Sequence, residues 1–143
     1  MRALVVEDRF LIRMTIRDLL EEAGFECAEA EDAAEALALL DSGDWVPDLL
    51  VSDYDLGPGP NGMALAEEAL RRLPDLPVLF VTGNPECFDG RAWGLREHLL
   101  AKPFLPDDLI EAARALVAPN RDGTVAMVWS AGYLPAGGPA LVP

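Results

Sequence analysis

The stretch LLVSDYDLGPGPNG, residues 49–62, carries a short apolar run directly into two acids and then into a series of glycines and prolines. Its first three residues are typical of a buried strand. Asp53 and Asp55 follow at the end of that strand, where Asp commonly caps a turn, so turn formation alone could explain them. Whether these acids have a chemical role depends on what the rest of the chain places beside them.

Strand-like and helix-like patterns alternate along the chain. Apolar runs predict strands at residues 3–6, 25–30, 48–52, 77–81 and 99–101. Helical periodicity predicts helices over residues 10–23, after an N-cap at Asp32, around residues 66–73, and from Pro106 onward. Gly90 and Gly94 interrupt any long helix between the last two strands, so that segment is expected to be short or irregular.

This alternation implies an α/β fold with a parallel sheet, helices on both of its faces and right-handed crossovers. In such sheets the functional crevice lies outside the carboxyl ends of the strands. Polar residues follow four of the predicted strands: Glu7 and Asp8, then Asp53, Thr82 and Lys102. Each has an ordinary structural explanation, as a cap, a turn residue, a strand former or a solvated charge. Because all of them are predicted to lie at the same edge of one sheet, a functional site is the better explanation.

The chemistry of that edge is coherent. Carboxylates drawn together repel one another unless a cation offsets their charge, and such oxygen ligands suit Mg²⁺. A carboxylate can also attack phosphorus as a nucleophile. The ammonium of Lys102 and the hydroxyl of Thr82 could then bind the phosphoryl oxygens. We therefore interpret Asp53 as a nucleophile and not as a cap.

These residues give the chain a family resemblance over roughly residues 1–117. It resembles the receiver domain of two-component response regulators, through Glu7-Asp8, Asp53 after an apolar strand, Thr82-Gly83, and Lys102-Pro103-Phe104. The resemblance implies a flavodoxin-like, doubly wound α/β fold, with a five-stranded parallel sheet of order 2-1-3-4-5 and helices on both faces. It also implies a receiver domain over residues 1–118.

The resemblance assigns a role to each site residue. Asp53 would be the phosphoacceptor, and Thr82 and Lys102 would bind the phosphoryl group. Mg²⁺ would be held by Glu7, Asp8, Asp53 and the backbone carbonyl of Asp55. The Asp55 side chain itself could be incidental, and the Lys102–Pro103 peptide is commonly cis in this family.

The resemblance also implies partners. A sensor histidine kinase or a histidine phosphotransfer protein would donate the phosphoryl group, and the output would pass to an unknown downstream protein or along a phosphorelay. The chain would be a phosphoacceptor that catalyses its own phosphoryl transfer and slow hydrolysis, and not an enzyme acting on other substrates. A homodimer is left open.

The sequence departs from the family pattern at Leu99, where many receivers carry a switching Tyr or Phe. We expect the neighbouring His98, the single histidine, to be a surface residue at a strand edge. Phe80, Thr82 and Gly83 partly match the Phe-Ala-Thr-Gly motif of a subset of alphaproteobacterial receivers, which includes stand-alone and general-stress-response regulators.

Composition narrows the function further. The 143 residues include 11 basic and 25 acidic side chains, a net charge of −14, which argues against direct DNA binding.

No signal peptide opens the chain, and no apolar run reaches the roughly 20 residues that span a bilayer. Cys27 and Cys87 show no metal spacing and no CxxC motif, so we expect buried, reduced thiols in a cytoplasmic protein.

Beyond the predicted receiver, residues 119–143 are rich in Gly and Pro, with no charge after Asp122. No output domain is expected there. This tail is interpreted as an extension, or as a docking or dimer surface supplied by Val128, Trp129 and Tyr133.

Two alternative functions remain open from the sequence. One is a non-phosphorylated pseudo-receiver that serves as a binding module. The other is an aspartate-nucleophile phosphatase of the haloacid-dehalogenase type, because Asp53-Tyr54-Asp55 resembles that family's DxD motif.

Overall fold

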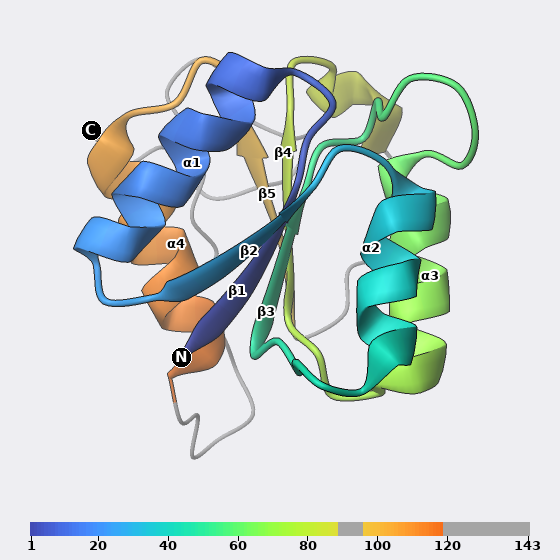
Figure 1. The fold of residues 1–143 in the computed structure, drawn as a ribbon. Coiled ribbons are helices and arrows are strands. Elements are labelled where there is room, and N and C mark those ends of the chain that lie inside the picture. The colour runs from blue at the N-terminus through green and yellow to red at the C-terminus, as the bar shows by residue number, and fades with distance from the viewer. Residues whose placement is uncertain (89–95, 119–143) are drawn as a thin grey trace.

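The computed structural model describes residues 1–88 and 96–118, and within these ranges the strands form one five-stranded sheet of order β2-β1-β3-β4-β5 (Figure 1). The strands are β1 (Arg2–Val6), β2 (Glu26–Ala30), β3 (Leu49–Ser52), β4 (Val78–Thr82) and β5 (Glu97–Ala101). Every neighbouring pair is parallel. The predicted fold class and strand order are confirmed.

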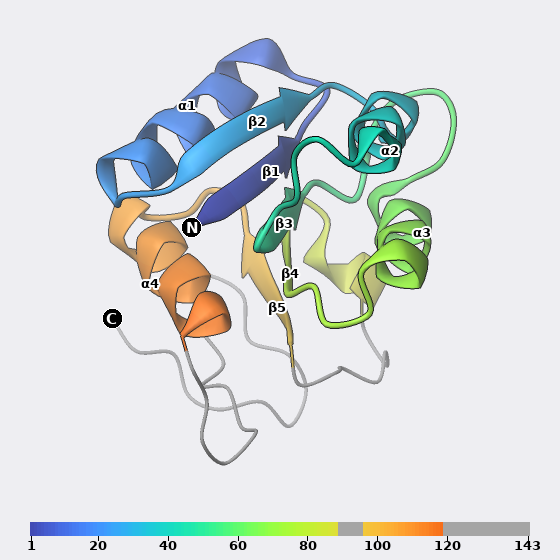
Figure 2. The ribbon, with the colours of Figure 1, turned by 60° about the horizontal axis from the view of Figure 1, so that its bottom comes forward.

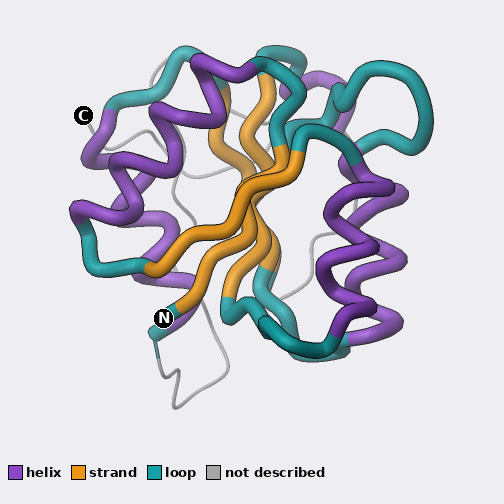
Figure 3. The backbone as a smooth tube through the Cα atoms, in the orientation of Figure 1, coloured by secondary structure: helices purple, strands orange, loops and turns teal. Residues whose placement is uncertain are grey.

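Helices cover both faces of the sheet, as Figures 2 and 3 show from two directions. The helices α1 (Phe10–Glu22) and α4 (Pro106–Val117) pack on one face, and α2 (Ala33–Ser42) and α3 (Gly62–Arg72) pack on the other. The doubly wound arrangement expected from the sequence is therefore confirmed.

Each face of the sheet has its own apolar core, because successive strand side chains point to opposite faces. In β1, Leu4 and Val6 join the core beneath α2 and α3, whereas Ala3 and Val5 join the core beneath α1 and α4. Since both faces are covered, the central strands are apolar throughout, which is why they appear as continuous runs in the sequence.

Several helix ends follow the predicted local chemistry. The Asp32 side chain accepts a hydrogen bond of 2.8 Å from the Glu35 backbone N–H and so caps α2, as predicted. Gly24, with φ of 99°, ends α1 in a left-handed conformation that favours glycine. The Asn61 side chain caps α3 in the same way as Asp32 caps α2, by accepting from the Ala64 N–H at 2.9 Å, and this cap was not predicted.

After β4 the structure describes a 3₁₀ turn, η1 (Pro85–Phe88). The expectation of a short or irregular connection rested on Gly90 and Gly94, and it stays a prediction. Residues 89–95 lie outside the described part of the chain. Phe88 from this turn is buried against Phe80 of β4 and lies edge-on to Tyr54, with ring centroids 5.0 and 5.4 Å away. This aromatic group joins the turn to the residue that follows Asp53.

Two expectations about single residues are wrong. β5 begins at Glu97, two residues before its predicted start, and His98 is therefore buried within the sheet, opposite Leu79, and is only 2% exposed. Burial lowers the pKa of His98 to about 4. Cys87 lies exposed on η1, whereas Cys27 is partly buried.

The predicted boundary at residue 118 lies next to the end of α4 at Val117. The predicted tail, residues 119–143, lies outside the described residues. Among the helices that the structure does describe, none has the length and apolar character needed to cross a membrane.

Candidate functional site

The carboxyl ends of four neighbouring strands bring the predicted site residues together. Backbone hydrogen bonds continue beyond the strands here: the Asp53 N–H donates to the Val6 carbonyl at 3.1 Å, and the Lys102 N–H donates to the Thr82 carbonyl at 2.7 Å. These bonds fix the residue after each strand at one edge of the sheet. The edge is the one that the topology of parallel sheets indicates for function.

Three carboxylates form a compact acidic group at this edge. Glu7, Asp8 and Asp53 each offer one oxygen, and these oxygens all lie within 4.8 Å of one another. The Lys102 ammonium donates to Glu7 Oε2 at 2.8 Å and to Asp53 Oδ2 at 3.0 Å. The lysine thus offsets part of the negative charge that the three acids concentrate.

Glu7 is the most enclosed of the three acids. It is 1% exposed, and its Oε1 accepts from the Arg9 backbone N–H at 3.3 Å. Burial raises the pKa of Glu7 to about 7, even though the Lys102 ammonium acts in the opposite direction. Asp53, which is 8% exposed, is the more accessible partner of the lysine.

A small pocket of about 160 Å³ opens over the acidic group. Its lining residues are Asp8, Arg9, Asp53, Asp55, Gly83, Asn84 and Lys102. A larger hollow of about 360 Å³ has a different lining, which includes Met1, Pro47 and Pro77, residues at the amino ends of the strands. The acidic group is the single cluster of three potential metal ligands among the described residues, and two of its members line the smaller pocket. The smaller pocket is therefore the better candidate for the functional site.

The Asp55 side chain is not incidental in this structure. Its Oδ2 accepts a hydrogen bond of 3.1 Å from the Asn84 side-chain amide, and its backbone N–H donates to Asp53 Oδ1 at 3.3 Å. Asp55 therefore links the loop after β3 to the loop after β4. The sequence offered no signal for Asn84 as its partner.

Thr82 lies deeper than the other predicted site residues. Its side chain is fully buried, and its Oγ1 accepts from the Asn84 backbone N–H at 3.0 Å. Thr82 is absent from the lining of the pocket. Its expected contact with a phosphoryl group stays a prediction, which would require the hydroxyl to turn towards the pocket.

A close backbone contact holds the loop of Asp53 in place. A Cβ atom at position 62 would overlap the Asp53 carbonyl oxygen and lie 2.9 Å from its carbonyl carbon. The Gly62 N–H also donates to the Tyr54 carbonyl at 2.7 Å. The first residue of α3 must therefore be glycine for the helix to start this close to the acidic group.

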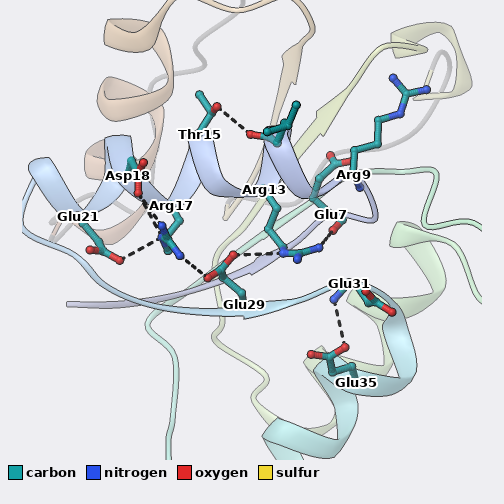
Figure 4. Close-up of polar contacts among 11 residues, drawn as sticks. Glu7, Arg9, Arg13, Thr15, Arg17, Asp18, Glu21, Glu29, Glu31 and Glu35 are labelled. Carbon is teal, nitrogen blue, oxygen red and sulfur yellow. Dashed lines mark hydrogen bonds and ion pairs between the residues drawn. The ribbon is translucent and has the colours of Figure 1, made fainter.

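Arg13 of α1 supports the site from outside (Figure 4). Its Nη1 donates to the Glu7 carbonyl at 2.8 Å, and its Nε donates to Glu29 of β2 at 3.2 Å. Arg17 contacts the same Glu29 carboxylate at 2.7 Å. This network fixes the end of β1, from which Glu7 and Asp8 project, and it was not predicted.

The position that often carries a switching aromatic residue holds the buried Leu99, as the sequence indicated. It is 1% exposed and packs in the same core as Phe80 and Phe88. The Lys102–Pro103 peptide bond is cis, as the resemblance implied.

Comparison with known proteins agrees with this geometry. The family model described as the response regulator receiver domain matches residues 3–114. The chain belongs to this family. The match covers the sheet except its first residue, Arg2, the four α-helices except the last turn of α4, and every residue of the acidic site.

The chain is similar to a transcriptional regulator and to a respiration control protein. It is 35% identical over 119 residues to the phosphate regulon transcriptional regulatory protein PhoB of Pseudomonas aeruginosa, covering 80% of this chain and 50% of that protein. It is 35% identical over 126 residues to the aerobic respiration control protein ArcA of Escherichia coli K12, covering 85% of this chain and 51% of that protein. The chain thus spans about half the length of these relatives.

Among solved structures, the receiver domain of the hybrid histidine kinase CckA aligns with a TM-score of 0.70 at 30% identity. The alignment covers 82% of this chain and all of that domain. These matches do not test the resemblance to the alphaproteobacterial subset, which stays a prediction.

Proposed function

We propose that this receiver domain accepts a phosphoryl group on Asp53 in a Mg²⁺-dependent reaction. The observation that carries the proposal is the position of the Asp53 carboxylate, which lines the pocket, lies within a group of three acids and contacts the Lys102 ammonium at 3.0 Å. A carboxylate in these surroundings is available to phosphorus, and a cation lies beside it.

The donor set fits Mg²⁺. Clustered carboxylate oxygens without nitrogen or sulfur ligands are what this ion prefers, and it retains several waters of its own. The proposed ligands are Glu7, Asp8, Asp53 and the backbone carbonyl of Asp55. When bound, Mg²⁺ would supply positive charge beside the transferred phosphoryl oxygens.

Three residues of the chain would carry the other roles in phosphoryl transfer. A carboxylate oxygen of Asp53 would form the new bond to phosphorus while the bond to the leaving group breaks. The Lys102 ammonium would donate to a phosphoryl oxygen in place of its present contact with Asp53. The Thr82 hydroxyl would donate to another oxygen, a role that its acceptor contact with Asn84 leaves free.

We further propose that the donor is a histidine kinase or a histidine phosphotransfer protein, and that the signal passes on by protein contact. Phe10 and Leu11 at the start of α1 and Leu105 before α4 are 60%, 69% and 55% exposed. All three lie in the chain just after strand ends that form the site, so an apolar partner surface could cover them while it reaches Asp53. The net charge of −14 makes direct DNA binding by this chain unfavourable.

The test is the intact mass of the protein after incubation with acetyl phosphate, with and without Mg²⁺. The wild type should gain one phosphoryl group only when Mg²⁺ is present, and Asp53→Asn should gain none. Asp107→Asn, at the exposed first turn of α4, is the matched control and should react as the wild type does.

Three other results would contradict the proposal. An adduct on Asp53→Asn would place the phosphoryl group elsewhere. No adduct on the wild type, either with acetyl phosphate or with a panel of histidine kinases, would favour the pseudo-receiver. Rapid turnover of a generic phosphomonoester would favour the phosphatase.

A further inference from the structure

Arg9 lies at the mouth of the acidic pocket, between β1 and α1. It occupies the N-cap position of α1 and lines the pocket together with Asp8, Asp55 and Asn84. Its backbone is held by the bond from its N–H to Glu7, whereas its side chain is exposed. In Figure 4 this side chain extends away from Glu29 and the arginines that contact it.

The Arg9 guanidinium differs from the other basic groups in having no hydrogen bond or ion pair among the described residues. Every other Lys or Arg side chain in the described ranges donates to an acid or a carbonyl: Arg2, Arg13, Arg17, Arg71, Arg72, Arg96, Lys102 and Arg114. In a chain with a net charge of −14, an arginine beside acids that pairs with none of them is the exception.

Binding of a phosphoryl donor in this pocket requires a positive charge that is not already paired with an acid. A phosphoryl donor carries negative charge into a pocket lined by Asp8, Asp53 and Asp55, which repel it. The Lys102 ammonium is already shared between Glu7 and Asp53. Arg9 is the other basic residue of the lining, its side chain is exposed, and a planar guanidinium matches two phosphoryl oxygens at once.

We propose that Arg9 is a substrate-binding residue, which pairs with the phosphoryl oxygens of the donor and holds the donor against Asp53 before transfer. The inference rests on the proposed function, which supplies the reaction. With acetyl phosphate, an Asp53 oxygen forms a bond to phosphorus. The bond from phosphorus to the oxygen that bridges it to the acetyl group breaks, and acetate leaves with the electron pair. Arg9 contributes binding energy to this step and exchanges no proton.

The experiment compares Arg9→Ala and Arg9→Lys with the wild type and with Arg71→Ala, which removes an equal charge from an exposed site on α3. Initial rates of phosphorylation are measured against acetyl phosphate concentration at saturating Mg²⁺. Binding of acetylphosphonate, whose carbon–phosphorus bond prevents transfer, is measured in parallel by NMR titration, and Mg²⁺ affinity by calorimetry.

Arg9→Ala should raise the half-saturating concentration of acetyl phosphate and the dissociation constant of acetylphosphonate by about threefold to tenfold, since the contact is charge-assisted but exposed. Arg9→Lys should recover part of this loss, because it restores the charge without the planar fork. Arg71→Ala should match the wild type, and Mg²⁺ affinity should not weaken in any variant.

Equal donor dependence in Arg9→Ala and the wild type would overturn the inference, as would an equal effect of Arg71→Ala or a parallel loss of Mg²⁺ affinity. If the wild type binds acetylphosphonate through Arg9 but is never phosphorylated, the role of Arg9 stands and the proposed phosphoryl transfer falls. If the wild type binds no acetylphosphonate, the inference falls regardless of phosphorylation by a kinase.

Discussion

Glu7 and Asp53 share one lysine but differ in how far solvent reaches them. Glu7 is enclosed and bonded to the backbone at Arg9, whereas Asp53 lines the pocket. Because the Lys102 ammonium lies between them, the buried acid can retain the lysine when the accessible acid changes its partner. This asymmetry suits a site in which one carboxylate reacts and the other keeps the cation in place.

Replacing Gly62 by alanine is expected to destabilise the fold. The added methyl group would overlap the Asp53 carbonyl, and relieving that contact must move either the loop after β3 or the start of α3. Overpacking of this kind costs roughly 1–3 kcal/mol, measurable as a lower free energy of unfolding in urea.

The matched control for that substitution is Gly83→Ala. Nothing lies within 4 Å of a Cβ built on Gly83, so this variant should retain wild-type stability. Equal stability of Gly62→Ala and the wild type would mean that the start of α3 adjusts freely, and that the close approach is not required.

At the level of secondary structure, β5 begins two residues before its predicted start. The sequence predicted its apolar end but not its start, because Glu97 and His98 carry polar side chains that normally mark a strand boundary. The Asn61 cap was missed for a related reason: the run of glycine and proline before it predicted a loop without indicating where the loop ends. The Asp32 cap was found because no such run precedes it.

The buried histidine in β5 predicts a loss of stability in acid. Both His98 ring nitrogens lack a hydrogen-bond partner among the described residues, and burial holds the pKa of this group at about 4 instead of the ordinary 6.5. The unfolded chain therefore takes up a proton first, so the full contribution to stability is present above pH 6.5 and is lost as the pH falls towards 4. The loss is on the order of 3 kcal/mol.

Urea unfolding at several pH values between 7 and 4.5 tests this expectation. His98→Leu, which cannot be protonated, should lose less stability over that range than the wild type. Parallel pH dependences in the two proteins would show that His98 titrates alike in the folded and unfolded states.

At the scale of the whole molecule, topology explains both what the sequence could predict and what it could not. The rule that parallel strands present their carboxyl ends at one edge was enough to gather Glu7, Asp8, Asp53, Thr82 and Lys102. Contacts between loops escaped prediction, since the bond from Asn84 to Asp55 depends on side-chain positions that no periodicity encodes. The unpaired guanidinium of Arg9 likewise depends on how the other basic side chains of residues 1–88 and 96–118 pair, which no periodicity encodes either.

A chain that ends at residue 118 is expected to fold as the 143-residue chain does. Among the described residues, both apolar cores are made of side chains from Ala3 to Val117. The 118-residue and 143-residue chains should therefore unfold in one cooperative step at similar urea concentrations. A large fall in the midpoint on truncation would show instead that residues 119–143 belong to the folded unit.

The contact between Lys102 and Glu7 joins residues 95 positions apart in the chain, and that between Lys102 and Asp53 spans 49. Such distant pairings form late, because the entropy of closing long loops must be overcome first. During synthesis, Glu7 and Asp53 leave the ribosome well before the lysine that will lie between them. A finished acidic site is thus also a mark of completed folding, and a chain that stalls before β5 docks carries its clustered acids without their counter-charge.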